Sequence, residues 1–136
     1  MINNKTSPPP LLSICIPAYN RPKLIQRTLN SIEPKNREIE IIICDNSTND
    51  ETKEVVQKSL KNETCTWKYF KNNPSISPTE NHNKCIKLAR GRYIYIIHDD
   101  DYLLPGGLQL ILKHLQASKH KVIMFGIKTV TITEET

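Results

Sequence analysis

The chain has 136 residues, of which 38% are hydrophobic and 24% are charged, and its formal net charge is +5. This length is enough for one domain with a hydrophobic core, and no apolar run approaches the roughly 18 residues of a membrane span. The 19 Lys and Arg residues are scattered rather than gathered in a basic stripe with aromatics, so nucleic-acid binding is not predicted.

The four cysteines have no C-x-x-C spacing, which disfavours a zinc site or a thioredoxin-like motif. Cys15 and Cys44 lie inside apolar segments and are expected to be small, buried hydrophobic residues. Unpaired cysteines favour a reducing compartment, so a cytoplasmic location is predicted. Residues 1–10 are polar and proline-rich without the apolar core of a signal peptide. They are expected to form a disordered lead-in to a domain that occupies residues 11–136.

The first half of the chain alternates apolar strands with amphipathic helices. Residues 11–16 predict a strand, and Pro17 begins a loop. Pro22 suits the first turn of a helix, which is predicted to run to about residue 33 with its apolar residues on one face. Residues 38–45 predict a second strand, whose three consecutive isoleucines indicate burial on both faces, as in a parallel sheet.

Thr48 and Glu51 have the spacing of a capping box, which predicts a helix to about residue 61. Residues 66–70 predict a third strand, with Trp67 and Tyr69 on one face.

Ser77 and Glu80 form a second capping-box pattern, with Pro78 at the first helical position, and predict a helix that Gly91 stops. Residues 92–97 predict a fourth strand. Pro105 is expected to open a helix that buries its leucine and isoleucine side chains. Residues 121–125 predict a fifth strand.

Strands alternating with helices predict a mostly parallel α/β sheet flanked by helices. In such sheets, ligands bind outside the carboxyl ends of the strands, near the point where the strand order reverses. Unusual residues fall at three of these ends: residues 17–20, Asp45, and residues 99–101. If the strand order is 3-2-1-4, these three clusters line one crevice.

Three consecutive carboxylates repel one another unless a cation neutralises them, so residues 99–101 suggest a rim that holds a hard divalent ion. The chain has no glycine-rich phosphate loop. An acidic rim would therefore bind a diphosphate through a bridging Mn²⁺ or Mg²⁺, which can stabilise it as a leaving group. The alternative is a solvated acidic turn after a strand.

Three segments together carry a resemblance to a known family. They are residues 13–21, 41–47 and 89–101. In this order and spacing they resemble the family 2 glycosyltransferases, over residues 11–108. The resemblance implies a GT-A fold and transfer of a sugar from a nucleotide diphosphate sugar, with inversion at the anomeric carbon.

The resemblance also implies roles for residues of the first two segments. Pro17, Ala18 and Tyr19 match positions that contact the nucleotide. Asp45 matches the acid that reads the base, often uracil, which favours a UDP-sugar donor. Taken alone, Asp45 could equally cap the polar loop that follows it, and Tyr19 could be a packed surface tyrosine.

In the third segment, Asp99 and Asp100 match an Asp pair near the ribose and the metal. Asp100 is the expected metal ligand, and Asp101 could share that role. His98 stands where many members have the first Asp of an Asp-x-Asp motif. Asn83 matches a helix position that is often Asn in the family and is added to the donor-binding residues.

The resemblance assigns no residue of this chain to binding or activating the acceptor. Members of the family are longer than this chain, and an inverting transfer needs a base to deprotonate the acceptor. No such base is identified, so the catalytic residues are unknown. The chain is expected to be the truncated donor-binding half of a glycosyltransferase that lacks its acceptor half. The alternative is a non-catalytic α/β nucleotide-binding or interaction module.

Three expectations concern partners and location. The acceptor is expected to be a saccharide or a lipid-linked saccharide, used at the inner face of a membrane by a peripheral protein. The open edge and apolar face of an incomplete sheet predict self-association of the chain.

Overall fold

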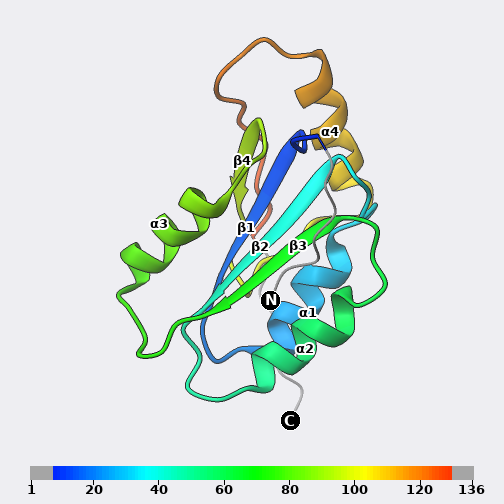
Figure 1. Cartoon of the computed structure of the whole chain (residues 1–136). Coiled ribbons are helices and arrows are strands. Elements are labelled where there is room, and N and C mark those ends of the chain that lie inside the picture. Colours follow the sequence, from blue (N-terminus) through cyan, green and yellow to red (C-terminus); the bar gives the residue numbers. More distant parts are fainter. Residues whose placement is uncertain (1–7, 130–136) are drawn as a thin grey trace.

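The computed structural model describes residues 8–129. Strands and helices alternate along this part of the chain (Figure 1). They are β1 (Leu12–Ala18), α1 (Pro22–Ser31), β2 (Ile39–Asp45), α2 (Glu51–Leu60), β3 (Thr66–Lys71), α3 (Pro78–Leu88), β4 (Tyr93–Ile96) and α4 (Gly107–Ala117). The four strands form one parallel sheet in the order β3-β2-β1-β4, which is the order under which the three clusters were expected to share one crevice. No described helix is long and apolar enough to cross a membrane.

The two central strands, β1 and β2, are buried along their whole length. Alternate residues point to opposite faces of a strand, so both faces of the sheet must be covered. The larger hydrophobic core lies between one face and the helices α1, α2 and α4. Figure 1 shows α3 on the opposite side of the sheet from α1 and α2. The isoleucine run of β2 therefore predicted the burial of this strand correctly.

The face under α3 is lined by small side chains. Cys15, Cys44 and Cys85 form a compact buried cluster with Ile42. Burial, with smaller contributions from the charges of neighbouring groups, raises the pKa of Cys15 to about 12, which keeps this thiol protonated. None of the four cysteines, all of which lie in the described chain, is in a disulfide, and all four are buried, so Cys15 and Cys44 pack as small hydrophobic residues, as the sequence predicted.

The connection from α3 to β4 is fixed by a buried carboxylate at the amino end of the sheet. Glu40 has no exposed surface and accepts hydrogen bonds from Ser13 Oγ at 2.6 Å and from Arg90 N at 2.5 Å. Ser13 Oγ in turn accepts a bond from Gly91 N at 2.7 Å. The guanidinium of Arg90 and the ammonium of Lys68 lie 3.6 and 3.9 Å from the other oxygen of Glu40.

Several predicted helix boundaries differ from the structure. α2 starts after Asp50 without a side-chain cap, and Thr48 instead bonds Asn20, so its predicted capping box is wrong. The capping box of Ser77 and Glu80 is confirmed. Local spacing favoured both boxes equally, but in the loop before α2 the Thr48 side chain is engaged by a tertiary contact with Asn20 instead.

The ends of two other helices also differ. α3 ends with Ala89 as its C-cap rather than at Gly91. The glycine is required for a different reason, since its backbone lies against β1. α4 begins at Gly107, two residues after Pro105, and Gly106 before it has a positive φ of 76° that disfavours other residues.

The predicted fifth strand, at residues 121–125, is wrong, because the segment forms no ladder with the sheet. Ile123 packs against the larger core, and the ring of Phe125 lies 6.1 Å from that of His114 on α4. Of residues 121–125, only Ile123 is partly buried, and the others are exposed. An apolar run favours a strand by composition, but it carries no information on the hydrogen-bonding neighbour that a strand needs.

Two expectations about the edges of the domain remain predictions. Residues 1–7 of the expected lead-in lie outside the described residues, whereas Pro10 is buried and its carbonyl accepts a bond from Arg92 N. In the described chain, β4 has β1 as its sheet neighbour on one side only, and Ile94 on it is 44% exposed. Such an edge favours self-association.

Gly91→Ala should destabilise the domain, because an added Cβ would lie 2.5 Å from Ser13 Oγ and 2.6 Å from Ser13 N. Overpacking of this kind costs about 1–3 kcal/mol, and here part of the obstacle is backbone. Urea denaturation should show this loss. Gly126→Ala is the matched control, since its added Cβ would meet nothing within 4 Å. Equal stability of the two variants would contradict the close approach of Gly91 to β1.

Candidate functional site

The carboxyl ends of the strands lie level with one another. Ala18 pairs with Asp45, and Asp45 pairs with Lys71, across the three neighbouring strands β1, β2 and β3. Cys15 pairs with Ile96 on β4. Asp99 follows Ile96 by three residues, as Ala18 follows Cys15, so the chain after β4 reaches the same edge of the sheet. The predicted clusters therefore converge on one edge.

Asp99 ties the loop after β1 to the chain after β4. Its carboxylate is buried, and Oδ2 accepts a hydrogen bond from Tyr19 N at 2.9 Å. The other oxygen, Oδ1, lies 2.9 Å from Arg21 Nη1 in a charge-assisted pair. The hydrogen bond to Asp99 and the charge of Asp99 raise the pKa of Arg21. Asp99 thus anchors the loop after β1.

The backbone of the same segment is held by the first helix. Thr28 Oγ1 donates to the carbonyl of Asp101 at 2.5 Å, and Arg27 Nη2 donates to the carbonyl of Asp100 at 2.7 Å. The guanidinium of Arg27 also lies 4.6 Å from the ring centroid of Tyr102. These contacts hold the chain after Asp99 against the second half of α1 and leave the side chains of Asp100 and Asp101 exposed.

The loop after β1 is also joined to the loop after β2. Asn20 N donates to Ser47 Oγ at 2.8 Å, while Asn20 Oδ1 accepts from Thr48 N at 2.9 Å. Asn20 has a positive φ of 50°, a conformation that asparagine tolerates better than most residues. The two loops therefore form one hydrogen-bonded rim, with the side chain of Tyr19 exposed beside it.

Asp45 is completely buried at the end of β2. One oxygen accepts from Ser47 N at 2.8 Å, and the other accepts from Tyr69 Oη at 2.5 Å. The ammonium of Lys71 lies 3.8 Å from the second oxygen. Burial, then the hydrogen bond to Asp45, raises the pKa of Tyr69. In this structure Asp45 caps the loop that follows it, which is the alternative that the sequence left open.

A network of buried asparagines lies behind this rim. Asn72 Nδ2 donates to Asn46 Oδ1 at 2.8 Å and to Asn81 Oδ1 at 2.7 Å. Asn81 Nδ2 donates to the carbonyl of Cys44 at 2.9 Å, and Lys84 Nζ donates to Asn72 Oδ1 at 2.7 Å. The network fixes the start of α3 against the end of β2. The network was not predicted from the sequence, although Asn46 and Asn72, which directly follow the ends of β2 and β3, were a usable signal.

Asn83 does not join this network. It lies on the exposed side of α3, whereas Asn81, two residues earlier, is buried. A shift of two residues on a helix moves a side chain by about 200° around the axis, which explains the difference. His82, next to it, lies with its ring 5.3 Å from that of His98, so α3 reaches the segment that precedes the carboxylates.

The metal ligands expected at the rim are Asp100 and Asp101. Among residues 8–129, no group of three or more His, Cys, Asp or Glu side chains is arranged to hold a metal ion. Mg²⁺ in nucleotide enzymes is often held by one or two carboxylates together with substrate phosphates. The two exposed carboxylates fit this way of binding, in which the ion arrives with a diphosphate. They do not form a cage made of protein ligands alone.

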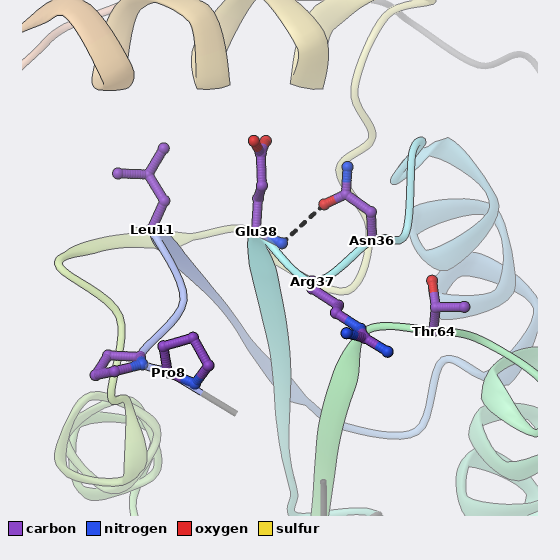
Figure 2. Close-up of a pocket in the computed structure, with 7 residues that line it drawn as sticks. Pro8, Leu11, Asn36, Arg37, Glu38 and Thr64 are labelled. Carbon is purple, nitrogen blue, oxygen red and sulfur yellow. Dashed lines mark hydrogen bonds between the residues drawn. The ribbon is translucent and has the colours of Figure 1, made fainter. Parts of the chain in front are cut away.

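Two surface hollows lie at opposite ends of the sheet. One, of about 630 Å³, is lined by residues just before β1, β2 and β3, including Leu11, Glu38 and Thr64 (Figure 2). The other, of about 370 Å³, lies between the segment after Asp45 and the segment from Lys71 to Ser75. Ligands of parallel α/β sheets bind at the carboxyl ends of the strands, so the smaller hollow belongs to the candidate site and the larger does not.

The chain is similar to known proteins in both sequence and fold. Residues 13–135 match the sequence profile described as glycosyl transferase family 2. The chain belongs to this family. Among its curated family 2 relatives is the GalNAc(5)-diNAcBac-PP-undecaprenol beta-1,3-glucosyltransferase of Campylobacter jejuni, 35% identical over 106 residues, which cover 76% of this chain and 34% of the relative. The chain spans about a third of the length of the curated relatives that it matches first.

Solved structures of glycosyltransferases share the fold. TarS of Staphylococcus aureus (residues 1–349), solved in complex with UDP, superposes with a TM-score of 0.67 at 26% identity, covering 75% of this chain and 31% of TarS. A mannosyltransferase of Pyrobaculum calidifontis, solved with GDP-Man and Mn²⁺, gives a TM-score of 0.67 at 18% identity, covering 83% and 34%. The family 2 chain therefore has the GT-A fold that its motifs predicted.

The structure thus brings together most of the predicted donor-site residues of this family 2 chain. Tyr19 and Asp99 are joined directly, and Asp45 lies on the same edge two strands from the chain after β4. Pro17 and Ala18 are buried inside β1, so their side chains face the protein. Arg21 is the partner that the sequence analysis missed, although three adjacent carboxylates did predict a neutralising cation.

The pKa of Tyr69 predicts how stability depends on pH. A phenol whose pKa is higher in the folded than in the unfolded chain stabilises the fold fully below its ordinary pKa of about 10 and loses this contribution as the pH rises further. The free energy of unfolding should therefore fall more steeply between about pH 9 and 11 in the wild type than in Tyr69→Phe. Chemical denaturation at several pH values measures both slopes, and parallel slopes would contradict the buried pairing with Asp45.

Asn81→Ala and Asn83→Ala form a matched pair on one helix. The first removes the acceptor of Asn72 and the donor to Cys44, and it should lower the free energy of unfolding by about 1–3 kcal/mol. The second should change it by less than about 0.5 kcal/mol, because the side chain is exposed. Thermal and urea denaturation would decide, and a loss confined to Asn83→Ala would refute the network.

Proposed function

We propose that this chain binds the nucleotide diphosphate sugar donor of an inverting glycosyltransferase, together with Mn²⁺ or Mg²⁺. The observation that carries the proposal is the joined rim at the carboxyl end of the sheet, where the loop after β1 is bonded both to Asp99, after β4, and to the loop after β2. Membership of the family supports it, as do the UDP of TarS and the GDP-Man and Mn²⁺ of the mannosyltransferase.

The residues of the rim suit the parts of such a donor. The exposed ring of Tyr19 offers an apolar face to the base or the ribose. Asp45 has two oxygens engaged by Ser47 and Tyr69, but a carboxylate offers about four acceptor positions. A base N–H, as uracil provides, would use one of the remaining positions only after the groups that cover Asp45 move aside, because this side chain has no exposed surface. The match of Asp45 to the base-reading acid of the family is the support for a UDP-sugar.

Asp100 and Asp101 would hold the divalent ion against the diphosphate. A bound ion would neutralise the negative charge of the nucleoside diphosphate as it leaves the sugar. Asp99 has a different task, because its buried carboxylate holds the loop that carries Tyr19. This division explains why only the second and third carboxylates of the triplet face solvent.

The acceptor is proposed to be a saccharide or a lipid-linked saccharide. The support is the name of the Campylobacter relative, whose acceptor is linked to undecaprenol through a diphosphate. On this ground we propose that the protein acts in the cytoplasm, peripheral to the inner face of a membrane. The base that deprotonates the acceptor is not assigned to any residue of this chain.

Calorimetric titration of UDP, with and without Mn²⁺, tests the donor site. Wild type should bind UDP more tightly with Mn²⁺, and Asp100→Ala should weaken this binding by at least about tenfold, because it removes a ligand of the ion. Glu54→Ala, which removes an exposed carboxylate on α2, is the control and should bind as wild type.

The same titration with GDP tests the choice of base. Binding of UDP that does not depend on Mn²⁺ would contradict the metal, and absence of binding for both nucleotides would contradict the donor site. A single-turnover assay with a UDP-sugar and an acceptor then separates an enzyme from a module that only binds.

A further inference from the structure

One guanidinium nitrogen contacts two carboxylates that differ in burial. Arg21 Nη1 lies 2.9 Å from Asp99 Oδ1 and 3.3 Å from Asp100 Oδ2. The side chain of Asp99 is 4% exposed, while that of Asp100 is 45% exposed, close to the 48% of Arg21 itself. Arg21 thus links the buried anchor of the β1 loop to a carboxylate proposed to hold the metal.

We propose that Arg21 is a positioning residue that exchanges one of its partners when the donor binds. Without donor, it neutralises both Asp99 and Asp100. With donor, it keeps Asp99, releases Asp100 to the divalent ion, and pairs with the anionic diphosphate. This inference rests on the proposed function and assigns a role to a residue outside the predicted donor site.

The two ion pairs of Arg21 differ in a way that permits the exchange. Asp99 is held in place by Tyr19 N as well as by Arg21, and its burial strengthens both contacts. Asp100 is exposed, and an ion pair between exposed groups contributes little because water solvates both partners. A divalent ion therefore competes with Arg21 for Asp100 far more easily than for Asp99.

The chemistry of Arg21 suits the second partner. A guanidinium presents five N–H donors in a plane and binds phosphate oxygens in pairs. Among the described cationic side chains, Arg21 alone forms ion pairs with Asp99 and Asp100. Lys71 is paired with Asp45 and Asp50, at the other side of the rim. Arg27 also reaches this segment, but it bonds the carbonyl of Asp100 and lies over the ring of Tyr102. Arg21 is therefore the cation that is paired with the carboxylate proposed to hold the metal.

The exchange predicts effects of opposite sign when Arg21 is removed. In Arg21→Gln, Asp100 loses its internal counter-ion, so Mn²⁺ alone should bind about three- to fivefold more tightly. Binding of UDP in saturating Mn²⁺ should weaken by about tenfold or more, because a charge-assisted contact to phosphate is lost. If Arg21→Gln acted only by loosening the β1 loop, the affinities for both Mn²⁺ and UDP would fall.

The experiment measures Mn²⁺ binding by the EPR signal of the free ion and UDP binding by calorimetry, in wild type and in three variants. Arg21→Lys keeps the charge and should recover part of the UDP affinity. Lys23→Gln removes the same charge from an exposed position on α1 and should change neither affinity by more than about twofold. Uridine, followed by NMR, lacks the diphosphate and should bind wild type and Arg21→Gln equally.

Each outcome decides between the two proposals. Tighter Mn²⁺ with weaker UDP in Arg21→Gln supports the exchange. A fall in both affinities, or no change in either, overturns the exchange and leaves the donor site standing, provided that wild type binds UDP with Mn²⁺. A wild type that binds neither overturns the proposed function, and the exchange with it.

Discussion

The burial of β1 and β2 on both faces is the constraint on which the rest of the structure depends. Because neither strand can face water, the helices must divide between the two sides of the sheet, and the connections must cross over in parallel. Parallel strands all end at one edge, so the loops after β1 and β2 and the chain after β4 meet there. The candidate site follows from this arrangement, since Asp45 and Asp99 are far apart in the sequence but level in the sheet.

The site combines a rigid support with an exposed rim. Asp45 and Asp99 are buried and engaged in hydrogen bonds, whereas Tyr19, Asp100 and Asp101 are exposed. Buried polar groups must be paired, which makes the first two good anchors for the loops. The exposed carboxylates remain available to an ion that arrives with its ligand. Neighbouring acidic residues therefore take different roles because their burial differs.

The amino-terminal edge of the sheet contrasts with this arrangement. There, Glu40 is buried with Ser13 and the Arg90–Gly91 backbone, and these contacts hold α3 and β4 to the central strands. The larger surface hollow lies at the same end, before the strands begin. The polar groups at this end are used to join parts of the fold to one another. The larger hollow therefore does not mark the edge at which ligands of such sheets bind.

The pattern of residues along the chain was enough to predict the order of strands and helices, the two-sided burial of β2, and the family, through its three motifs. These features depend on local periodicity and on residues next to one another in the chain. The folded structure was needed to show that Arg21 pairs with Asp99, that Asn81 rather than Asn83 is buried, and that residues 121–125 do not join the sheet. Each of these depends on which distant groups compete for a side chain or a backbone edge, and that competition has no local signal.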